Sequence, residues 1–403
     1  MRDRKLTPLS DRGPLRVMFV VTSMPIGGAE TLLVELARRM ARERFAPEVC
    51  CLKRLDSLGE KLAEEIPVHA GLLSGKYDIA VFWRLARLMR RRRIDAVVTV
   101  GPGDKMFWGR LAARAAGVPV ICSAIHSTGY PDRVEWPNRL LAGWNDAFIA
   151  VAESHGRYLA EHEGCPAGKV RVIPNGIDVE RFHPRWPDRQ LQDELCLEPG
   201  APTVGIISAL RPEKNHELFL YVAALVRKAL PAARFLIVGE GPERGRLESL
   251  ARSLGVGEAV RFTGARRDVE KVLSLIDVVA LTSRMEANPL CLLEAMACEK
   301  PVVAARVGSV VESVRHGETG YLTAPGDSQE MAARWLQLLH GRELAASMGR
   351  AGRESVIARW SVDSMVRGYE DLLSGLYSAK CGRAGSPKVA SDGTSRKPQL
   401  RLR

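Results

Sequence analysis

Two glutamates, Glu286 and Glu294, interrupt an apolar stretch that reads EANPLCLLEAMACEKPVV. The run DVVALTS before them predicts a strand, and Pro289 suits the first turn of a helix. Such a loop lies at the carboxyl edge of a parallel sheet, where ligands bind and where the free amides of a helix start attract phosphate. The amides of Leu290 and Cys291 would meet an anion, and the two carboxylates would accept hydrogen bonds from hydroxyl groups. The alternative is a helix-start charge at Glu286 and a surface carboxylate at Glu294.

A second charged stretch, SALRPEKNHELF (208–219), follows the predicted strand TVGIIS. Arg211 and Lys214 supply the positive charge that a diphosphate requires. Taken alone, this stretch would be interpreted as a solvated basic loop. Because it lies in the same predicted domain as the glutamate segment, we favour a diphosphate site.

Two further features lie at a similar sheet edge in the first half of the chain. The turn PIGGAE (25–30) contains Gly27 and Gly28, which would let the backbone approach a ligand closely and aim its amides at it. It lacks the G-x-G-x-x-G spacing, which disfavours a nicotinamide-type site. His126 ends the run VPVICSAIH, and it is either a structural histidine or a group that faces the second domain across a cleft.

Strands and helices alternate along both halves of the chain. Short apolar runs such as RVMFVVTSM, DAVVTV and RFLIVG are each followed by apolar residues at helical spacing. This alternation predicts two doubly wound α/β domains with parallel sheets, and a length of 403 residues agrees with two cores. We expect a polar N-terminal segment (1–15), a first domain (16–183), a proline-rich linker (184–201) and a second domain (202–361). A last amphipathic helix (362–377) and a basic disordered tail (378–403) should follow.

The net charge of +12 is unevenly distributed. Residues 1–150 carry +8, residues 151–377 carry −2 and residues 378–403 carry +6. The stretch RLARLMRRRR (84–93) holds six arginines beside apolar residues. It is either a solvated helix with a basic end or a surface attracted to anionic lipid head groups. A basic first half would also suit nucleic acid or an acidic acceptor.

No run approaches the roughly 18 apolar residues of a membrane-spanning helix, and residues 1–16 are polar, so we expect neither an integral nor an exported protein. The eight cysteines contain no C-x-x-C pair and form no metal-like cluster with histidine. Reduced, mostly buried thiols are typical of a cytosolic protein, and no metal site is expected. The sequence therefore predicts a cytoplasmic protein, peripheral at most on the inner face of a membrane.

An ordered set of motifs resembles the family 4 retaining glycosyltransferases of GT-B fold. GGAE, VPVICSAIH, VIPNGIDVERFHP, LRPEKNHELF, FLIVGEGPER, VRFTGARRDV and EANPLCLLEAMACEKPVVA occur in the family's order and spacing, from about Val17 to Leu373. The last motif is fairly specific, and the ordered set is strong. The resemblance implies two Rossmann-like domains that face each other across a cleft, the first for an acceptor and the second for a nucleotide diphosphate sugar. It also implies a final helix that returns to the first domain.

The resemblance implies roles for individual residues as well. Glu294 would hold the ribose hydroxyls, Glu286 would lie near the transferred sugar, and Lys214 would bind the diphosphate. His126 would lie near the donor sugar, and Gly28 would form the glycine loop over the phosphates. Further donor contacts are implied for the backbone at Asn288, Leu290 and Cys291, and for the turn at Gly264 and Arg266, which matches the family's base-contacting turn.

The chain departs from the family at one position. The family often places an arginine five residues before the diphosphate lysine, and here Ala209 stands there. Either Arg211 substitutes for that arginine, or the loop holds the diphosphate more weakly. The absence of any D-x-D triplet fits the family's metal independence.

The resemblance thus predicts a metal-independent glycosyltransferase that needs no cofactor besides its donor. It would move a sugar, with retention, from a nucleotide diphosphate sugar to a hydroxyl acceptor, for which a lipid-linked or cell-envelope glycan is one candidate. Two alternatives stay open. One is a GT-B nucleotide-sugar epimerase, which needs no acceptor, and the other is a non-catalytic binder of sugar nucleotides or polyanions. Nucleic acid is not expected as a partner.

Overall fold

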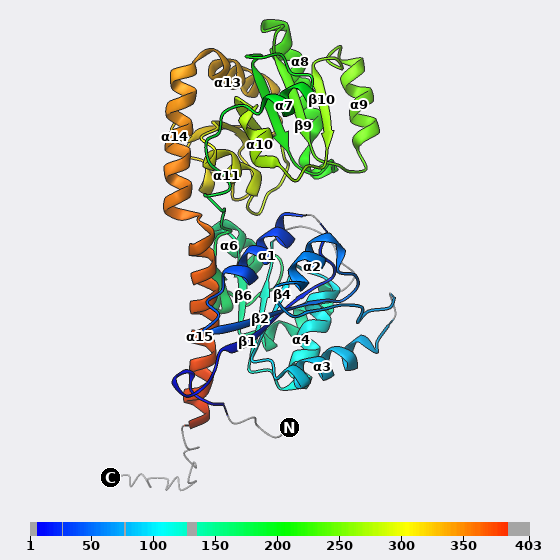
Figure 1. Cartoon of the computed structure of the whole chain (residues 1–403), viewed down its shortest axis with the longest axis vertical. Helices are drawn as coiled ribbons and strands as arrows, with labels where there is room; N and C mark the ends of the chain where they lie inside the picture. Colours follow the sequence, from blue (N-terminus) through cyan, green and yellow to red (C-terminus); the bar gives the residue numbers. More distant parts are fainter. Residues whose placement is uncertain (1–5, 26, 76–77, 127–134, 386–403) are drawn as a thin grey trace, which may run out of the picture.

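The computed structural model describes residues 6–25, 27–75, 78–126 and 135–385, and these ranges form two parallel sheets (Figure 1). The sheets have seven and six strands, in the orders β3-β2-β1-β4-β5-β6-β7 and β10-β9-β8-β11-β12-β13. The first contains β1 (Leu15–Val21), β2 (Phe45–Cys51), β3 (Val68–His69), β4 (Ala96–Val100), β5 (Val120–Ala124), β6 (Ala147–Ala150) and β7 (Val170–Val172). The second contains β8 (Thr203–Ile207), β9 (Arg234–Val238), β10 (Val260–Gly264), β11 (Val278–Leu281), β12 (Val302–Ala305) and β13 (Gly320–Thr323).

Helices cover both faces of each sheet, as expected for parallel strands joined by crossovers. The helices of the first half are α1 (Gly28–Arg39), α2 (Asp56–Ala63), α3 (Val81–Arg92), α4 (Asp104–Ala116), α5 (Glu135–Leu140) and α6 (Glu153–Glu161). Those of the second half are α7 (Arg189–Glu194), α8 (His216–Ala229), α9 (Arg244–Ser253), α10 (Val269–Ser274), α11 (Leu290–Ala297), α12 (Val310–Ser313), α13 (Ser328–His340), α14 (Arg342–Arg359) and α15 (Val362–Gly385). The predicted doubly wound α/β class is confirmed.

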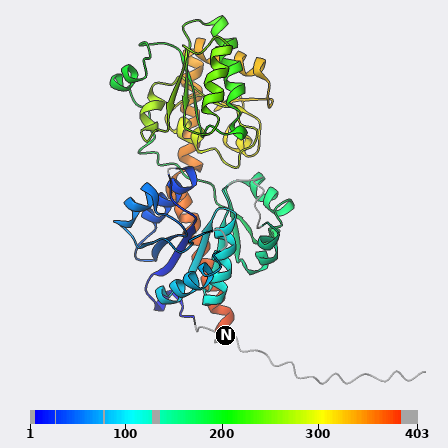
Figure 2. The same ribbon diagram turned by 90° about the vertical axis from the view of Figure 1, so that its right-hand side faces the viewer.

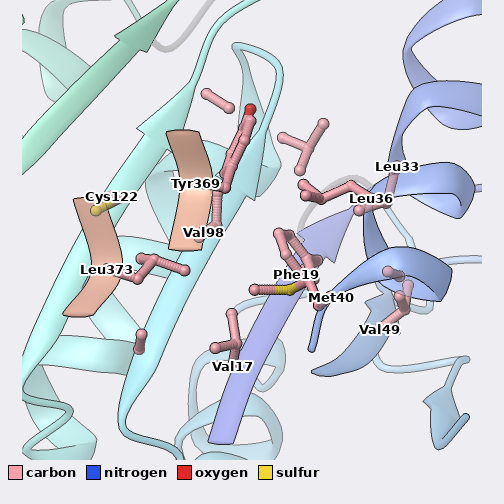
Figure 3. Close-up of a cluster of buried hydrophobic side chains, with 14 of the residues drawn as sticks. Val17, Phe19, Leu33, Leu36, Met40, Val49, Val98, Cys122, Tyr369 and Leu373 are labelled. Atoms are coloured by element: carbon pink, nitrogen blue, oxygen red, sulfur yellow. The ribbon is translucent and has the colours of Figure 1, made fainter. Parts of the chain in front are cut away.

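The first core shows how the strand pattern places the helices. Phe19 on β1 pairs in register with Val49 on β2 and with Val98 on β4, and all three are fully buried. Their side chains lie on one face of the sheet, packed against Leu33 and Leu36 of α1 (Figure 3). The alternate residues of the same strands point to the other face, where α3 and α4 cover them. Strands with two apolar faces therefore give a sheet buried on both sides.

The last helix belongs by its packing to the first half of the chain. Tyr369 and Leu373 of α15 are buried in the same cluster as Phe19 (Figure 3). The helix continues to Gly385, eight residues beyond the end that we predicted at 377. In this added part of the helix, the ammonium group of Lys380 lies 2.6 Å from a carboxylate oxygen of Asp146. The rest of the predicted tail, residues 386–403, and residues 1–5 of the polar N-terminal segment lie outside the described residues.

The chain crosses between the two sheets at two places that lie side by side. Ile177 on the outward crossing donates to the carbonyl of Trp360 and accepts from the amide of Val362 on the return. A Cβ atom at Gly176 would lie only 2.4 Å from the Cα of Val362, so this close approach requires glycine. In the turned view the two sheets lie one above the other, with these crossings between them (Figure 2).

The expected linker and the second half contain more helix than the sequence suggested. Helix α7 lies within residues 184–201, and its Leu191 is buried against the second core. Helices α13 and α14 follow β13, where no helix had been predicted before residue 362. No helix in the described ranges combines the length and the apolar character needed to cross a membrane.

Candidate functional site

The glutamate segment forms the loop and helix that its sequence predicts. Strand β11 ends at Leu281, and α11 begins at Leu290 with Pro289 as the residue before it. The helix buries Leu292, Leu293 and three further residues in the second core, which fixes its orientation. The loop before it therefore lies at the carboxyl edge of the second sheet.

Lys214 and Glu286 form an ion pair at this edge. The Lys214 Nζ atom lies 2.7 Å from Oε1 of Glu286, and only 8% of the Glu286 side chain is exposed. Burial alone would lower the pKa of Lys214, but the charge of Glu286 and its hydrogen bond raise it. The Thr282 hydroxyl donates to the backbone carbonyl of Lys214 and so fastens the two loops together. Two residues that the sequence placed 72 positions apart are thus in contact.

Glu294 lies one turn into α11 and is partly buried. Burial raises the pKa of its carboxyl group to about 7, although the nearby Arg181 favours the charged form. Arg181 comes from the crossing segment and pairs with Glu270 at 2.9 Å. Glu294 is therefore not a freely solvated surface carboxylate. Its carboxyl group is neutral below about pH 7 and charged above it, and it can form hydrogen bonds in either state. Arg181 was not among the predicted site residues, although it lies inside the motif VIPNGIDVERFHP.

Cys291 lies between these charged groups. Burial raises the pKa of its thiol to about 12, and the charges of Glu286 and Glu294 act in the same direction. The thiol is therefore neutral at physiological pH. Its backbone N–H, at the second position of α11, belongs to the free amides that a helix start offers to an anion.

The glycine turn of the first domain meets the start of α11. A Cβ atom built on Gly28 would lie 3.1 Å from Cδ1 of Leu290, so the starts of α1 and α11 are in contact across the two domains. Leu290 packs against both the first and the second core. The sequence analysis assigned Gly28 and Leu290 to the same ligand, and the structure brings them together.

Glu30 at the start of α1 is a charged residue next to the predicted glycine turn that was not among the residues predicted from the sequence. Burial raises the pKa of its carboxyl group, against the opposing effects of its own backbone amide and of the charges of Lys105 and Arg211. A Cβ on Gly27 would lie 2.4 Å from its Oε2, so the carboxylate folds back over the glycine turn. Arg211 is itself exposed, and its charge acts on this carboxylate from the second domain.

His126 follows the end of β5 on the first domain. Burial lowers the pKa of its ring to about 4, a hydrogen bond with the Asn175 side chain opposes this, and the charge of Lys105 adds to it. The imidazole is therefore neutral at physiological pH. Asn175 comes from the segment PNG that begins the crossing between domains, so the histidine is held by the part of the chain that joins them.

The base-contacting turn has a different arrangement from the other predicted residues. Gly264 ends β10 with a positive φ of 75° and accepts a hydrogen bond from Gly239. Arg266 pairs with Asp268 at 2.8 Å and with Glu194 at 2.6 Å. Its guanidinium group is thus held in place by two carboxylates, and the assignment to a nucleotide base stays a prediction. Asn288 is half-buried, and its side-chain oxygen has no hydrogen-bond partner in the described ranges.

Sequence comparisons identify the family. The family described as "Glycosyltransferase Family 4" matches residues 26–181, and that described as "Glycosyl transferases group 1" matches residues 189–355. The chain belongs to glycosyltransferase family 4. This family 4 enzyme is accordingly a glycosyltransferase that uses a nucleotide sugar, as the motifs predicted. The family matches favour a glycosyltransferase over an epimerase and over a non-catalytic binder.

Characterised relatives cover most of the family 4 enzyme. It is 27% identical over 391 residues to the GDP-mannose-dependent alpha-(1-6)-phosphatidylinositol monomannoside mannosyltransferase of Mycobacterium tuberculosis, an alignment that covers 91% of this chain and 100% of the relative. It is 29% identical over 301 residues to the N-acetyl-alpha-D-glucosaminyl L-malate synthase of Bacillus anthracis, which covers 73% of this chain and 78% of the relative.

Solved structures establish the GT-B fold. The Anabaena protein Alr3699/HepE, in complex with UDP and glucose, superposes with a TM-score of 0.79 and 24% identity, over 90% of this chain and 100% of that chain. WaaG, a glycosyltransferase involved in lipopolysaccharide biosynthesis, superposes with a TM-score of 0.72 and 15% identity, over 89% of this chain and 100% of that chain. The two facing Rossmann-like sheets of the family 4 enzyme are thus those of a GT-B protein.

Proposed function

We propose that the enzyme transfers a glycosyl group, with retention, from a nucleotide diphosphate sugar bound to the second domain to a hydroxyl acceptor bound to the first. The observation that carries this proposal is the ion pair of Lys214 with Glu286 beside the start of α11, with Glu294 one turn further on. This arrangement offers a cation and helix amides to a diphosphate, and carboxylates to the hydroxyl groups on either side of it.

Each residue then has a separate task in binding the donor. Glu294 accepts hydrogen bonds from the ribose hydroxyls, and Glu286 accepts from the sugar that is transferred. The amides of Leu290 and Cys291 bind the diphosphate, and Lys214 neutralises the charge that develops as it departs. The glycine turn at Gly27 and Gly28 covers the phosphates from the first domain. Arg211 is a second cation for the diphosphate, and it substitutes for the family's arginine at the position where this chain has Ala209.

The acceptor reacts on the same face of the sugar from which the diphosphate leaves. The leaving phosphate oxygen takes the proton of the acceptor hydroxyl as the new glycosidic bond forms, so no protein nucleophile is required. Neutral His126 donates or accepts a hydrogen bond at the donor sugar without adding charge. Closure of the two domains excludes water, which limits hydrolysis of the donor.

The acceptor that we propose is a lipid-linked sugar at the inner face of a membrane. Helix α3 carries arginines along its length, and its own Trp83 and the preceding Ile79 are 69% and 73% exposed. Arginine next to exposed tryptophan suits the head-group region of an anionic membrane. The Mycobacterium tuberculosis relative is named for a phosphatidylinositol glycolipid acceptor, which supports the same class.

A donor screen tests the catalytic part of the proposal. The purified chain is incubated with UDP- and GDP-linked sugars, with and without lipid-linked and soluble acceptors, and released nucleoside diphosphate is measured. We expect release that depends on the acceptor, a product of retained configuration, and loss of both in Glu294→Ala. A rearranged sugar formed from donor alone would indicate an epimerase instead, and the absence of release with every donor would refute transfer.

Vesicle sedimentation tests the membrane part. We expect the protein to bind vesicles that contain phosphatidylglycerol and not vesicles of phosphatidylcholine alone, and Trp83→Ala with Arg87→Glu to weaken this binding. Trp186→Ala is the matched control, because Trp186 is 93% exposed but lies in the segment between the domains, away from α3. Equal loss of binding in both variants would contradict a membrane face at α3.

A further inference from the structure

Glu312 of the second domain makes a direct contact with the first domain. Its Oε2 atom accepts a hydrogen bond of 2.9 Å from the backbone N–H of Glu153, and its Oε1 atom accepts one of 2.7 Å from the backbone N–H of Ser154. These two amides are the first of helix α6, which lies on the side of the first domain that faces the second (Figure 1). A carboxylate from one domain thus caps a helix of the other.

The chemistry of this contact favours a charged Glu312. The first amides of a helix have no partner within the helix, and the helix dipole makes them a good site for a negative charge. Burial alone would raise the pKa of Glu312, but the hydrogen bonds from residues 153 and 154 and the charge of Arg157 lower it. The contact is therefore formed by an ionised carboxylate at neutral pH, and it is lost when the domains separate.

The segment that carries Glu312 also holds the donor loop. The amide of Ser309 donates to the backbone carbonyl of Glu286 at 3.2 Å, and the Ser309 hydroxyl donates to the carbonyl of Ala287. A Cβ atom at Gly308 would lie only 1.9 Å from the carbonyl oxygen of Glu286. Residues 308–312 therefore touch the first domain at one end and the backbone of Glu286 at the other. Glu286 in turn forms the ion pair with Lys214.

From this geometry we propose that Glu312 is a positioning residue that couples domain closure to the geometry of the donor loop. When Glu312 caps α6, the 308–312 segment is fixed, and the Glu286 loop is held against it with its side chain toward Lys214. When the domains open, the same segment loses its anchor in the first domain. The inference deepens the proposed function and rests on it for the identity of the donor loop. Glu312 lies outside the donor site and affects turnover by positioning the donor loop.

Four variants separate this role from a structural one. Glu312→Ala removes both hydrogen bonds, and Glu312→Gln removes the charge but keeps a side chain of equal size. Glu153→Pro removes one donating N–H from the other side of the contact. Proline is tolerated at the first position of a helix, and Ala152 before it is extended, with φ −159° and ψ 161°. Glu153→Ala is the reference for that variant, because it removes the same side chain and keeps the N–H.

Small-angle scattering and donor turnover are the two readouts. The full chain is measured alone and with saturating UDP or GDP, and turnover is measured as nucleoside diphosphate release with the donor and the acceptor that give release in the donor screen. We expect Glu312→Ala, and Glu153→Pro relative to Glu153→Ala, to have a larger radius of gyration and about tenfold lower kcat. We expect Glu312→Gln to lie between Glu312→Ala and wild type. Binding of UDP or GDP stays within about twofold of wild type, because the donor residues are intact.

Further comparisons decide the interpretation. The double variant Glu153→Pro/Glu312→Ala should be no slower than Glu312→Ala, because the two changes disrupt the same contact and Glu312→Ala already removes it completely. Glu318→Ala, which removes an exposed carboxylate that pairs with nearby Arg315, should match wild type. An unchanged scattering curve in Glu312→Ala would overturn the proposal, even if kcat falls. If wild type releases no nucleoside diphosphate with any donor and acceptor of the screen, the proposed function fails separately, and the scattering comparison still tests the closure contact.

Discussion

The ammonium group of Lys214 is 2.7 Å from the carboxylate of Glu286, and both side chains are mostly shielded from water. A diphosphate that binds Lys214 therefore enters a site in which the cation already has an anionic partner. The donor must share or replace that partner. Removal of either residue leaves the other charge uncompensated in a partly buried place, where the cost is greater than at the surface.

The two partners should have opposite effects on nucleotide binding. We expect Lys214→Ala to weaken the binding of UDP or GDP by at least about tenfold, because the diphosphate loses its cation. Glu286→Gln should tighten it several-fold, because Lys214 no longer has a competing anion. Both variants should turn over donor at least about a hundredfold more slowly. Calorimetric titration distinguishes them, and weaker nucleotide binding in Glu286→Gln would contradict the competition between carboxylate and diphosphate.

Nucleotide affinity should depend on the ionisation of Glu294. Its pKa is raised to about 7, and ribose hydroxyls donate best to the charged carboxylate. Wild-type affinity should therefore fall by up to about tenfold between pH 8 and pH 6. Glu294→Gln should bind more weakly at pH 8, and the ratio of its dissociation constant to that of wild type should shrink toward pH 6. This ratio removes the effect of the nucleotide's own phosphate ionisation, and a ratio that is constant with pH would refute the assignment.

His126 should act as a neutral group throughout the physiological range. Because folding lowers its pKa from 6.5 to about 4, its contribution to stability is present above pH 6.5 and is lost as the pH falls toward 4. Nuclear magnetic resonance of the ring should show no titration between pH 6 and pH 8. We expect His126→Gln, which keeps a neutral hydrogen-bonding side chain, to retain more activity than His126→Ala. A titration midpoint near 6.5 would show that the ring is solvated and would remove this role.

Gly308→Ala should damage both stability and turnover. Gly308 has a positive φ of 48°, and an added Cβ would collide with the backbone carbonyl of Glu286. Gly317→Ala is the matched control, because Gly317 also has a positive φ, of 80°, but has open space around its Cα. We expect the control to lose about 1 kcal/mol in urea denaturation and Gly308→Ala to lose more, together with activity. Equal losses of stability in the two variants would mean that the contact of residue 308 with the Glu286 carbonyl does not contribute to stability.

The sequence predicted the fold class because strands buried on both faces leave continuous apolar runs, and these alternate with helical spacing. Helix α7 was not anticipated. It depends on tertiary packing, because Leu191 is apolar but stands in a proline-rich segment and is buried against the second core. The domain boundaries stay predictions.

The site was predictable where its residues lie close together along the chain. The loop before α11 and its two glutamates follow from local spacing, and Lys214 follows from the charge of its loop. Glu30, Arg181 and Glu312 were missed because each acts through a residue far away in the sequence. Glu312 reaches amides 158 and 159 positions earlier, and no local pattern shows which helix start a given carboxylate will meet.

Helix α15 gives the chain an unusual order of assembly. The first core contains Phe19 near the beginning of the chain and Tyr369 and Leu373 near its end, in one packed cluster. During synthesis, the second sheet and all the residues of its core leave the ribosome before α15 can cover the first sheet. The amino-terminal half therefore keeps an apolar face uncovered until α15 has been translated, and a chain cut short within the second half leaves a first half that lacks part of its own interior.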